Sequence, residues 1–113
     1  MEGLNTANKI EIFVNTSKNG DDTDNEHSRT FCINFEDHTL ANSLRYMIMK
    51  NPNVIFCGYT QPHPSEFKIN FKIQTNRKQT ALEVLEKGLV DLNQTCAHVL
   101  DVFENSVNAY YNN

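Results

Sequence analysis

The last third of the chain contains an apolar repeat that constrains the fold more than any other feature. Apolar residues recur at alternating spacings of three and four, at Leu82, Leu85, Leu89, Leu92, Cys96, Val99 and Phe103. This spacing is typical of an amphipathic helix that packs along a seam. A second row at Ala81, Gly88, Thr95 and Val102 widens the apolar face to about three positions in seven. The sequence therefore predicts a helix of roughly 25 residues near the C-terminus.

Such a helix is long for the domain to which it belongs. At about 1.5 Å per residue it measures about 37 Å, whereas a globule of 113 residues with a radius of gyration of about 13 Å is only about 35 Å across. We infer that another chain supplies a helix to cover its broad apolar face; the alternative is that the sheet covers the whole face. Gly88 costs about 1 kcal/mol relative to Ala in a helix interior, which close approach of another backbone would offset.

Four strands and a shorter helix precede this long helix. Leu40, Leu44 and Ile48 have helical spacing, Asp37 or Thr39 can cap the helix, and the helix ends before Asn51-Pro52. The sequence predicts a compact α+β domain in the order β-β-α-β-β-α, with a four-stranded sheet, one short helix and one long C-terminal helix. Alternating or apolar runs place the strands near residues 10–14, 30–36, 54–59 and 67–74.

These strand predictions carry expectations about which side chains are buried. In the second strand, Phe31, Ile33 and Phe35 share one face. The third strand is largely apolar, which is typical of a strand covered on both faces. In the fourth, Phe67, Ile69, Phe71 and Ile73 alternate with polar residues, so we expect one buried face and one solvated face.

Length and composition indicate a single domain spanning residues 1–113, with frayed tails at 1–8 and 106–113 and a polar, acidic loop at 15–28. The net charge of −4 argues against broad non-specific nucleic-acid binding. No apolar run approaches the roughly 20 residues of a membrane span, and no signal peptide is recognisable. We therefore expect an intracellular, reduced protein whose cysteines, Cys32, Cys57 and Cys96, are small buried hydrophobes.

The segment 36–45 resembles an active site, because acids, a histidine, hydroxyls and an arginine lie within two helical turns. However, His38 and Ser43 are five residues apart, about 140° around a helix axis, so they do not face each other as a base and nucleophile must. The four histidines also lack the spacing of a metal site. We therefore predict no catalytic residue, no metal and no cofactor.

A single-stranded RNA-binding sheet is the alternative from another functional class. The segment 67–73 carries aromatic residues and lysines on one predicted strand, as stacking platforms do. Phe67 and Phe71 alternate with the lysines, however, so the rings face the side opposite the charge. The sequence also lacks the glycine-containing aromatic motif of RNA-recognition domains, and we expect no direct nucleic-acid binding.

Two separated blocks resemble a known family, the smaller alpha-like subunits of eukaryotic RNA polymerases, which are related to the dimerisation domain of the bacterial alpha subunit and to archaeal subunit L. The first block covers residues 36–45 and the second covers 51–66, and the resemblance runs from about Ile10 to Phe103. The second block is similar to the version shared by polymerases I and III, although Ala41 resembles the polymerase II counterpart. The family signature is carried by Asp37, His38, Thr39, Asn42, Arg45, Cys57, Gly58, His63 and Pro64.

The resemblance implies a non-catalytic assembly subunit of RNA polymerases I and III in the nucleus, including the nucleolus. It implies pairing with a larger alpha-like subunit, and contact with the second-largest subunit in the assembled enzyme that makes rRNA, tRNA and 5S RNA. The equivalent polymerase II subunit and a homodimeric scaffold are the alternatives. Core and partner seam would be formed by Leu40, Leu44 and Ile48 with the seven residues of the long helix, Leu82 to Phe103.

Overall fold

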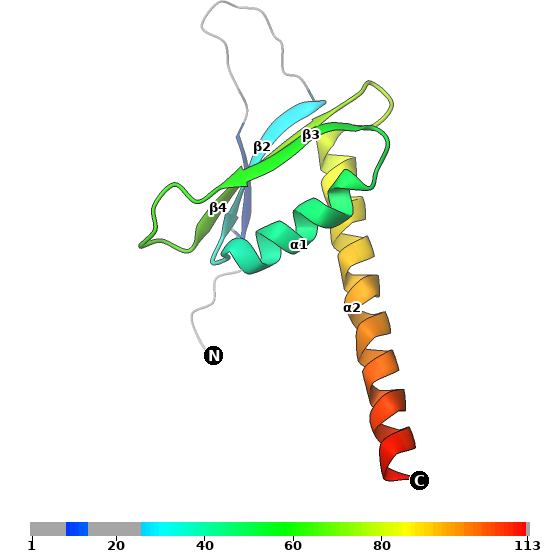
Figure 1. Cartoon of the computed structure of the whole chain (residues 1–113). Coiled ribbons are helices and arrows are strands. Elements are labelled where there is room, and N and C mark those ends of the chain that lie inside the picture. The colour runs from blue at the N-terminus through cyan, green and yellow to red at the C-terminus, as the bar shows by residue number, and fades with distance from the viewer. Residues whose placement is uncertain (1–8, 14–25, 113) are drawn as a thin grey trace, which may run out of the picture.

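The structure, a computed structural model, describes residues 9–13 and 26–112 and has the predicted element order. Residues 1–8 and most of the predicted acidic loop lie outside the described residues. Figure 1 shows a sheet with both helices on one of its faces, and the second helix running far beyond the sheet. The elements are β1 Ile10–Phe13, β2 Ser28–Asn34, α1 His38–Met49, β3 Val54–Thr60, β4 Lys68–Thr75 and α2 Ala81–Tyr111.

The sheet is antiparallel throughout, in the order β1-β2-β4-β3. Phe31 pairs with Phe71 and Ile33 pairs with Ile69, so the large apolar side chains of the two central strands lie on the same face. All four are buried under the helices. The two-residue alternation of the sequence therefore gives the sheet one apolar face, on which the core is built.

Two aromatic residues predicted on that buried face are exposed instead. β2 ends at Asn34, and Phe35 has a left-handed φ of 62° and a side chain that is 63% exposed. Its N–H donates to the carbonyl of Phe67, which precedes β4 and is itself exposed. The alternation rule fails here because it holds only within a strand, and the backbone turns away at Phe35.

The prediction that β3 is covered on both faces is wrong. β3 lies at the edge of the sheet, and its register shifts between Val54 and Phe56. Ile55 and Phe56 are exposed, whereas Cys57 points into the core. An apolar run does not report whether a strand is central or at an edge, since this depends on the order of strands in the sheet.

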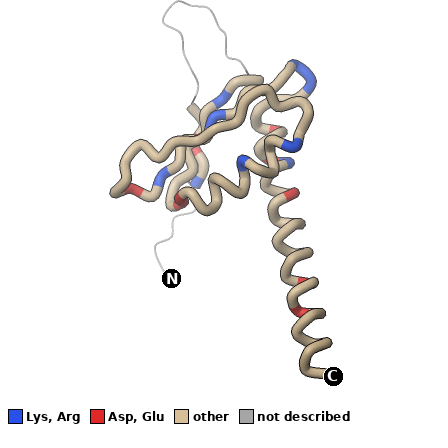
Figure 2. The backbone as a smooth tube through the Cα atoms, viewed as in Figure 1, with Lys and Arg blue, Asp and Glu red and all other residues tan. Residues whose placement is uncertain are grey.

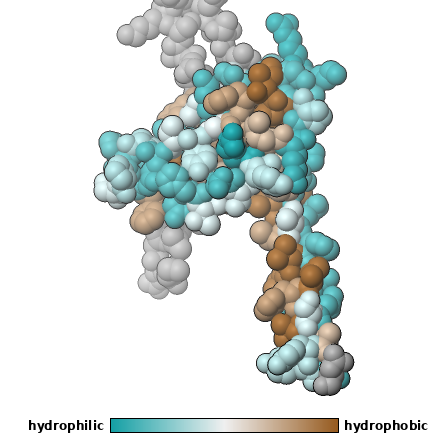
Figure 3. Space-filling view, viewed as in Figure 1, coloured by the Kyte–Doolittle hydropathy of each residue, from teal (hydrophilic) through white to brown (hydrophobic). Residues whose placement is uncertain are grey.

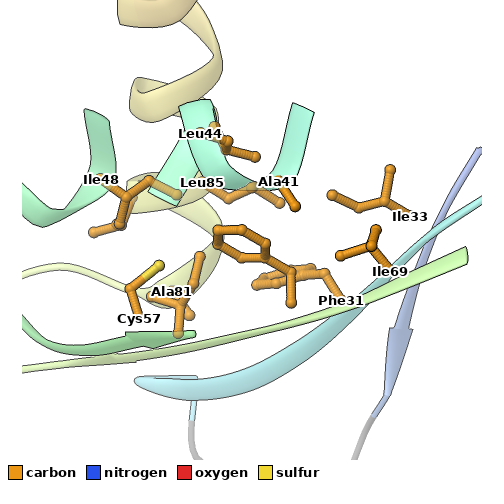
Figure 4. Close-up of a cluster of buried hydrophobic side chains, with 12 residues drawn as sticks. Phe31, Ile33, Ala41, Leu44, Ile48, Cys57, Ile69, Ala81 and Leu85 are labelled. Carbon is orange, nitrogen blue, oxygen red and sulfur yellow. The ribbon is translucent and has the colours of Figure 1, made fainter. Parts of the chain in front are cut away.

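The first helix begins and ends where the sequence predicts. Asp37 is its N-cap, and the Asp37 carboxylate accepts a 2.9 Å hydrogen bond from the N–H of Thr39. Leu44 and Ile48 are fully buried, and Leu40 packs partly buried against the same cluster. The predicted triad of apolar residues therefore docks α1 on the sheet of its own chain. The buried cluster of sheet and helix side chains is shown in Figure 4.

The second helix is longer than predicted, with 31 residues against about 25. Residues 106–111, expected to be a frayed tail, are helical. No proline interrupts this stretch, its glycine is at Gly88 near the start, and Ser106 donates its hydroxyl back to the carbonyl of Val102 at 2.9 Å. The helix therefore continues as a rod, and the longest dimension of the chain is 70 Å.

Gly88 lies where α1 and α2 approach each other closely, and a glycine inside a helix predicts such a close approach. A Cβ built at Gly88 would lie 2.5 Å from Cγ1 of Ile48 and 3.4 Å from Cδ1 of Leu44. The approaching element is α1 of the same chain. A methyl group there would clash with the fully buried Ile48, so that either this side chain leaves its packed position or α1 moves away from α2.

We therefore expect Gly88→Ala to destabilise the fold by about 1–3 kcal/mol, because overpacking outweighs the gain of about 1 kcal/mol in helix propensity. Thermal unfolding of the purified protein, followed by circular dichroism, measures this. Gln94→Ala on the exposed side of the same helix is the matched control and should be neutral. An unchanged or higher melting temperature for Gly88→Ala would contradict the close-packing argument.

Candidate partner interface

The polar residues of the first signature block have separate structural roles. The ring of His38 lies against Tyr59, with Nδ1 3.4 Å from the tyrosine hydroxyl. Ser43 donates its hydroxyl to the carbonyl of Thr39 at 3.0 Å, and Arg45 donates Nε to the carbonyl of Cys57 at 3.0 Å. The block therefore caps α1 and ties it to β3, and it does not align a nucleophile with a base.

The second signature block splits between the core and an exposed hairpin. Burial raises the pKa of the Cys57 thiol to about 11, although the nearby Arg45 charge acts in the opposite direction. The thiol is therefore protonated at neutral pH and serves as a small core side chain. His63 and Pro64 lie in the exposed turn between β3 and β4, where the N–H of Glu66 donates to the carbonyl of His63. In Figure 1 this turn extends from the end of the sheet away from α2.

One polar cluster at the start of α2 was missed by the sequence reasoning. Oε1 of Gln79 accepts hydrogen bonds from the side-chain amides of Asn51 and Asn53, at 2.9 and 3.0 Å. The backbone carbonyl of the same Gln79 accepts the hydroxyl of Thr75 at 2.6 Å. This cluster joins the end of α1, the start of β3 and the start of α2. Glutamine and asparagine in loops give no sequence signal for such pairing, because their partners are far apart in the chain.

The long seam of α2 divides into a core half and an exposed half. Leu85 is 2% exposed, and Leu89 and Leu92 pack partly buried against the core. Beyond them, Cys96 is exposed, and Val99 and Phe103 are 60% and 63% exposed. Figure 3 shows a brown, hydrophobic stripe along the rod. We call the exposed stripe the distal seam, and it comprises Cys96, Val99, Leu100, Val102 and Phe103.

A groove at the junction of the helices leads onto the distal seam. It has a volume of about 380 Å³ and is walled by Tyr46, Met47 and Lys50 of α1 and by Leu92 and Thr95 of α2. Tyr46 is 64% exposed, with the ammonium of Lys50 4.6 Å from its ring centroid. The groove and the seam together give an apolar surface that a second helix can enter.

The threonine and serine hydroxyls along this part of α2 are already hydrogen-bonded. Thr95 donates to the carbonyl of Asp91 at 2.9 Å, and Ser106 donates to that of Val102. A partner covering the rod would therefore not leave these hydroxyl donors unpaired, which would otherwise cost about 1–3 kcal/mol each. Leu82 is also exposed, 53%, and lines the same pocket as Ile12 of β1. The fold thus divides the seam residues predicted from the sequence into two groups. Leu85, Leu89 and Leu92 pack in or against the core, whereas Leu82 and the residues beyond Leu92 are exposed.

The described residues contain no group of three or more histidine, cysteine or acidic side chains that could hold a metal ion. Within the same ranges, neither helix is long and apolar enough to cross a membrane.

A small α+β domain that buries half of a long amphipathic helix and exposes the other half belongs to the class of helical dimerisation domains. Residues 28–102 match the family described as RNA polymerase Rpb3/Rpb11 dimerisation domain, and the chain belongs to this family. The resemblance inferred from the two signature blocks is thereby confirmed.

Relatives named as subunits of polymerases I and III are similar over most of the chain. The chain is 62% identical over 76 residues to subunit RPAC2 of RNA polymerases I and III from Schizosaccharomyces pombe, covering 67% of this chain and 61% of that protein. It is 60% identical over 75 residues to RPAC2 of Danio rerio, covering 66% and 67%. A probable RNA polymerase II subunit RPB11 from Caenorhabditis briggsae is less similar, 42% over 71 residues, covering 63% and 58%.

The fold also matches a solved structure. Subunit L of RNA polymerase from Thermoplasma acidophilum superposes with a TM-score of 0.68 at 15% identity, covering 92% of this chain and 95% of that one. At this identity the match concerns the fold alone, and it confirms the predicted α+β architecture with its β-β-α-β-β-α order.

Proposed function

We propose that this protein is a non-catalytic assembly subunit of RNA polymerases I and III that pairs with a larger alpha-like subunit and thereby nucleates assembly of the enzyme. The distal seam carries this proposal, because it leaves Val99 and Phe103 without cover from their own chain. A helix has little stability of its own in water and depends on packing of its apolar face. The groove beside Tyr46 continues this surface and offers a second site against which a partner helix can pack.

The assignment to polymerases I and III rests on the relatives. Identities of 60–62% to subunits of polymerases I and III exceed the 42% to the polymerase II subunit. Such subunits act in the nucleus, and we expect this chain there, including the nucleolus where rRNA is made. In the assembled enzyme we expect a second contact with the second-largest subunit. The polymerase chemistry belongs to other subunits, in agreement with a first signature block whose polar groups bind the chain's own backbone.

A tagged copy of the chain, purified at its natural abundance from nuclear extract, tests this function. We expect the larger alpha-like subunit together with the large subunits of polymerases I and III, and no large subunit of polymerase II. Recovery of the polymerase II large subunits in their place would reject the assignment. A purified chain that forms a stable homodimer, with no polymerase subunit recovered from extract, would support the homodimeric scaffold.

Cys96 provides a direct reporter of the interface, because its thiol is exposed in the distal seam whereas Cys32 and Cys57 are buried. The prediction that the three cysteines are small buried hydrophobes is therefore wrong for Cys96 in this chain. We expect maleimide labelling of Cys96 to be at least about tenfold slower in the heterodimer than in the urea-unfolded chain, and thiol mass spectrometry measures this.

The control for this labelling places a thiol on the opposite side of the same helix. Cys96→Ser combined with Gln94→Cys moves the thiol about 160° around the axis, at the same depth along the rod. This thiol should remain reactive in the heterodimer. Equal labelling of both positions would show that the distal seam is not covered.

A further inference from the structure

A feature of α2 beside the distal seam indicates what kind of partner surface it accepts. Glu86 and Glu104 are eighteen residues apart, which is five full turns, so the two side chains project in the same direction about 27 Å from each other. Leu82 and Leu100 have the same spacing and form the neighbouring apolar line. The glutamates therefore border the apolar surface along one edge, which we call the acidic edge.

The acidic edge is uncompensated within the described part of the chain. No ion pair joins Glu86, Asp101 or Glu104 to any described residue, whereas Asp91 on the other side of α2 is bound to Lys87 at 2.8 Å. No lysine or arginine follows Lys87 in the sequence. In Figure 2 the far part of the rod accordingly carries red segments and no blue ones. Glu86 and Glu104 thus border an apolar surface without a matching cation among the described residues.

We propose that the acidic edge selects the partner: the surface that covers the distal seam is an amphipathic helix with lysine or arginine along one border, placed to meet Glu86 at one end and Glu104 at the other. This inference rests on the proposed heterodimer and adds the charge pattern of its partner. Complementary charges at the rim of an interface favour correct partners and speed their encounter, and like charges disfavour wrong ones.

A second copy of this chain does not satisfy that requirement. In an antiparallel pairing of two α2 helices, the acidic edge would face the acidic edge of the other copy, so carboxylates would meet carboxylates. In a parallel pairing it would face the row Ala81, Gly88, Thr95 and Val102, which has no charge. Neither arrangement brings a cation to Glu104, so the acidic edge also acts against self-association.

Charge reversal in the heterodimer with the larger alpha-like subunit tests this inference. We expect Glu86→Lys with Glu104→Lys to weaken association about tenfold at 50 mM salt, which corresponds to two rim charge pairs of modest strength. The difference from wild type should shrink to less than about threefold at 0.5 M salt, because screening shortens the reach of exposed charges. Fluorescence-detected dissociation of the labelled heterodimer measures both values.

Three controls make the outcome specific. Glu66→Lys reverses an exposed charge on the hairpin remote from α2 and should leave affinity unchanged. Glu104→Gln removes the charge at nearly constant shape and should give a smaller loss than Glu104→Lys. Glutamate and lysine have similar helix propensities, so the rod itself remains helical, which circular dichroism checks.

The result also separates this inference from the proposed function. If the heterodimer forms and the double reversal weakens it no more than Glu66→Lys does, the acidic edge has no role although the pairing stands. If the wild-type chain does not bind the alpha-like subunit, the proposed function itself fails. Tighter self-association of the double-reversal variant than of wild type would support the edge as a barrier to homodimers.

Discussion

Replacing Phe103 by aspartate is expected to abolish pairing with the alpha-like subunit while the domain keeps its own fold. Phe103 is 63% exposed in the chain and makes no part of its buried core, so the carboxylate is solvated before pairing. In the covered seam the same carboxylate would be buried among apolar groups without a partner, which costs several kcal/mol. Co-purification with the tagged partner should fall at least about a hundredfold, as a loss near 3 kcal/mol implies.

The matched control places a carboxylate on the other side of the same turn. Asn105→Asp is about 160° around the axis from Phe103 and should leave pairing unchanged. Phe103→Leu keeps an apolar side chain and should retain most of the affinity. Wild-type yield of the complex with Phe103→Asp would show that the distal seam is not the partner surface.

Replacing Leu85 by aspartate is expected to prevent folding of the chain, although this residue belongs to the same seam. Leu85 is 2% exposed and packs in the cluster formed by the sheet, α1 and the start of α2. A charge there has no water and no counter-ion within the core. The milder change Leu85→Ala leaves a cavity and should lower the free energy of unfolding by about 2–5 kcal/mol.

Thermal unfolding of the purified heterodimer measures the effect of Leu85→Ala, and soluble yield on co-expression measures that of Leu85→Asp. Val90→Asp is the control, since Val90 is 48% exposed on the solvent side of the same helix and should tolerate the charge. A soluble Leu85→Asp complex that melts at the wild-type temperature would contradict the division of the seam into core and partner halves. Together the two aspartate series place this division between Leu85 and Phe103.

Much of the fold could be predicted from the sequence where local chemistry decides the structure. Asp37 as a cap, Pro52 as a stop and the apolar spacing of α1 each act within a few residues, and all appear as expected. The errors occur where a pattern of side chains within one strand was extended beyond the end of that strand, or was used to predict the position of the strand in the sheet. Phe35 continued the alternation of β2 but lies beyond the last strand residue, and Ile55 looked buried but lies in an edge strand.

The candidate site was predictable as a set of residues but not as a surface. The heptad spacing identified the residues of the seam except Leu100, because helical geometry follows from sequence separation alone. It could not show that Leu85 faces the chain's own sheet and Phe103 faces solvent, since both have the same angular position on the helix. The Gln79 cluster was not predictable at all, because its donors come from Asn51 and Asn53 far away in the chain.

The sequence by itself determined the order of the elements, the ends of α1 and the apolar stripe of α2, because caps, breakers and periodicity act over a few residues. Only the tertiary structure decided at which point along α2 the side chains of that stripe change from buried to exposed. This boundary depends on how far the sheet and α1 extend along α2, and α1 is seated by the close contact of Ile48 with Gly88. Beyond the end of that contact, the same repeat that builds the core in Leu85 becomes an exposed surface in Val99 and Phe103.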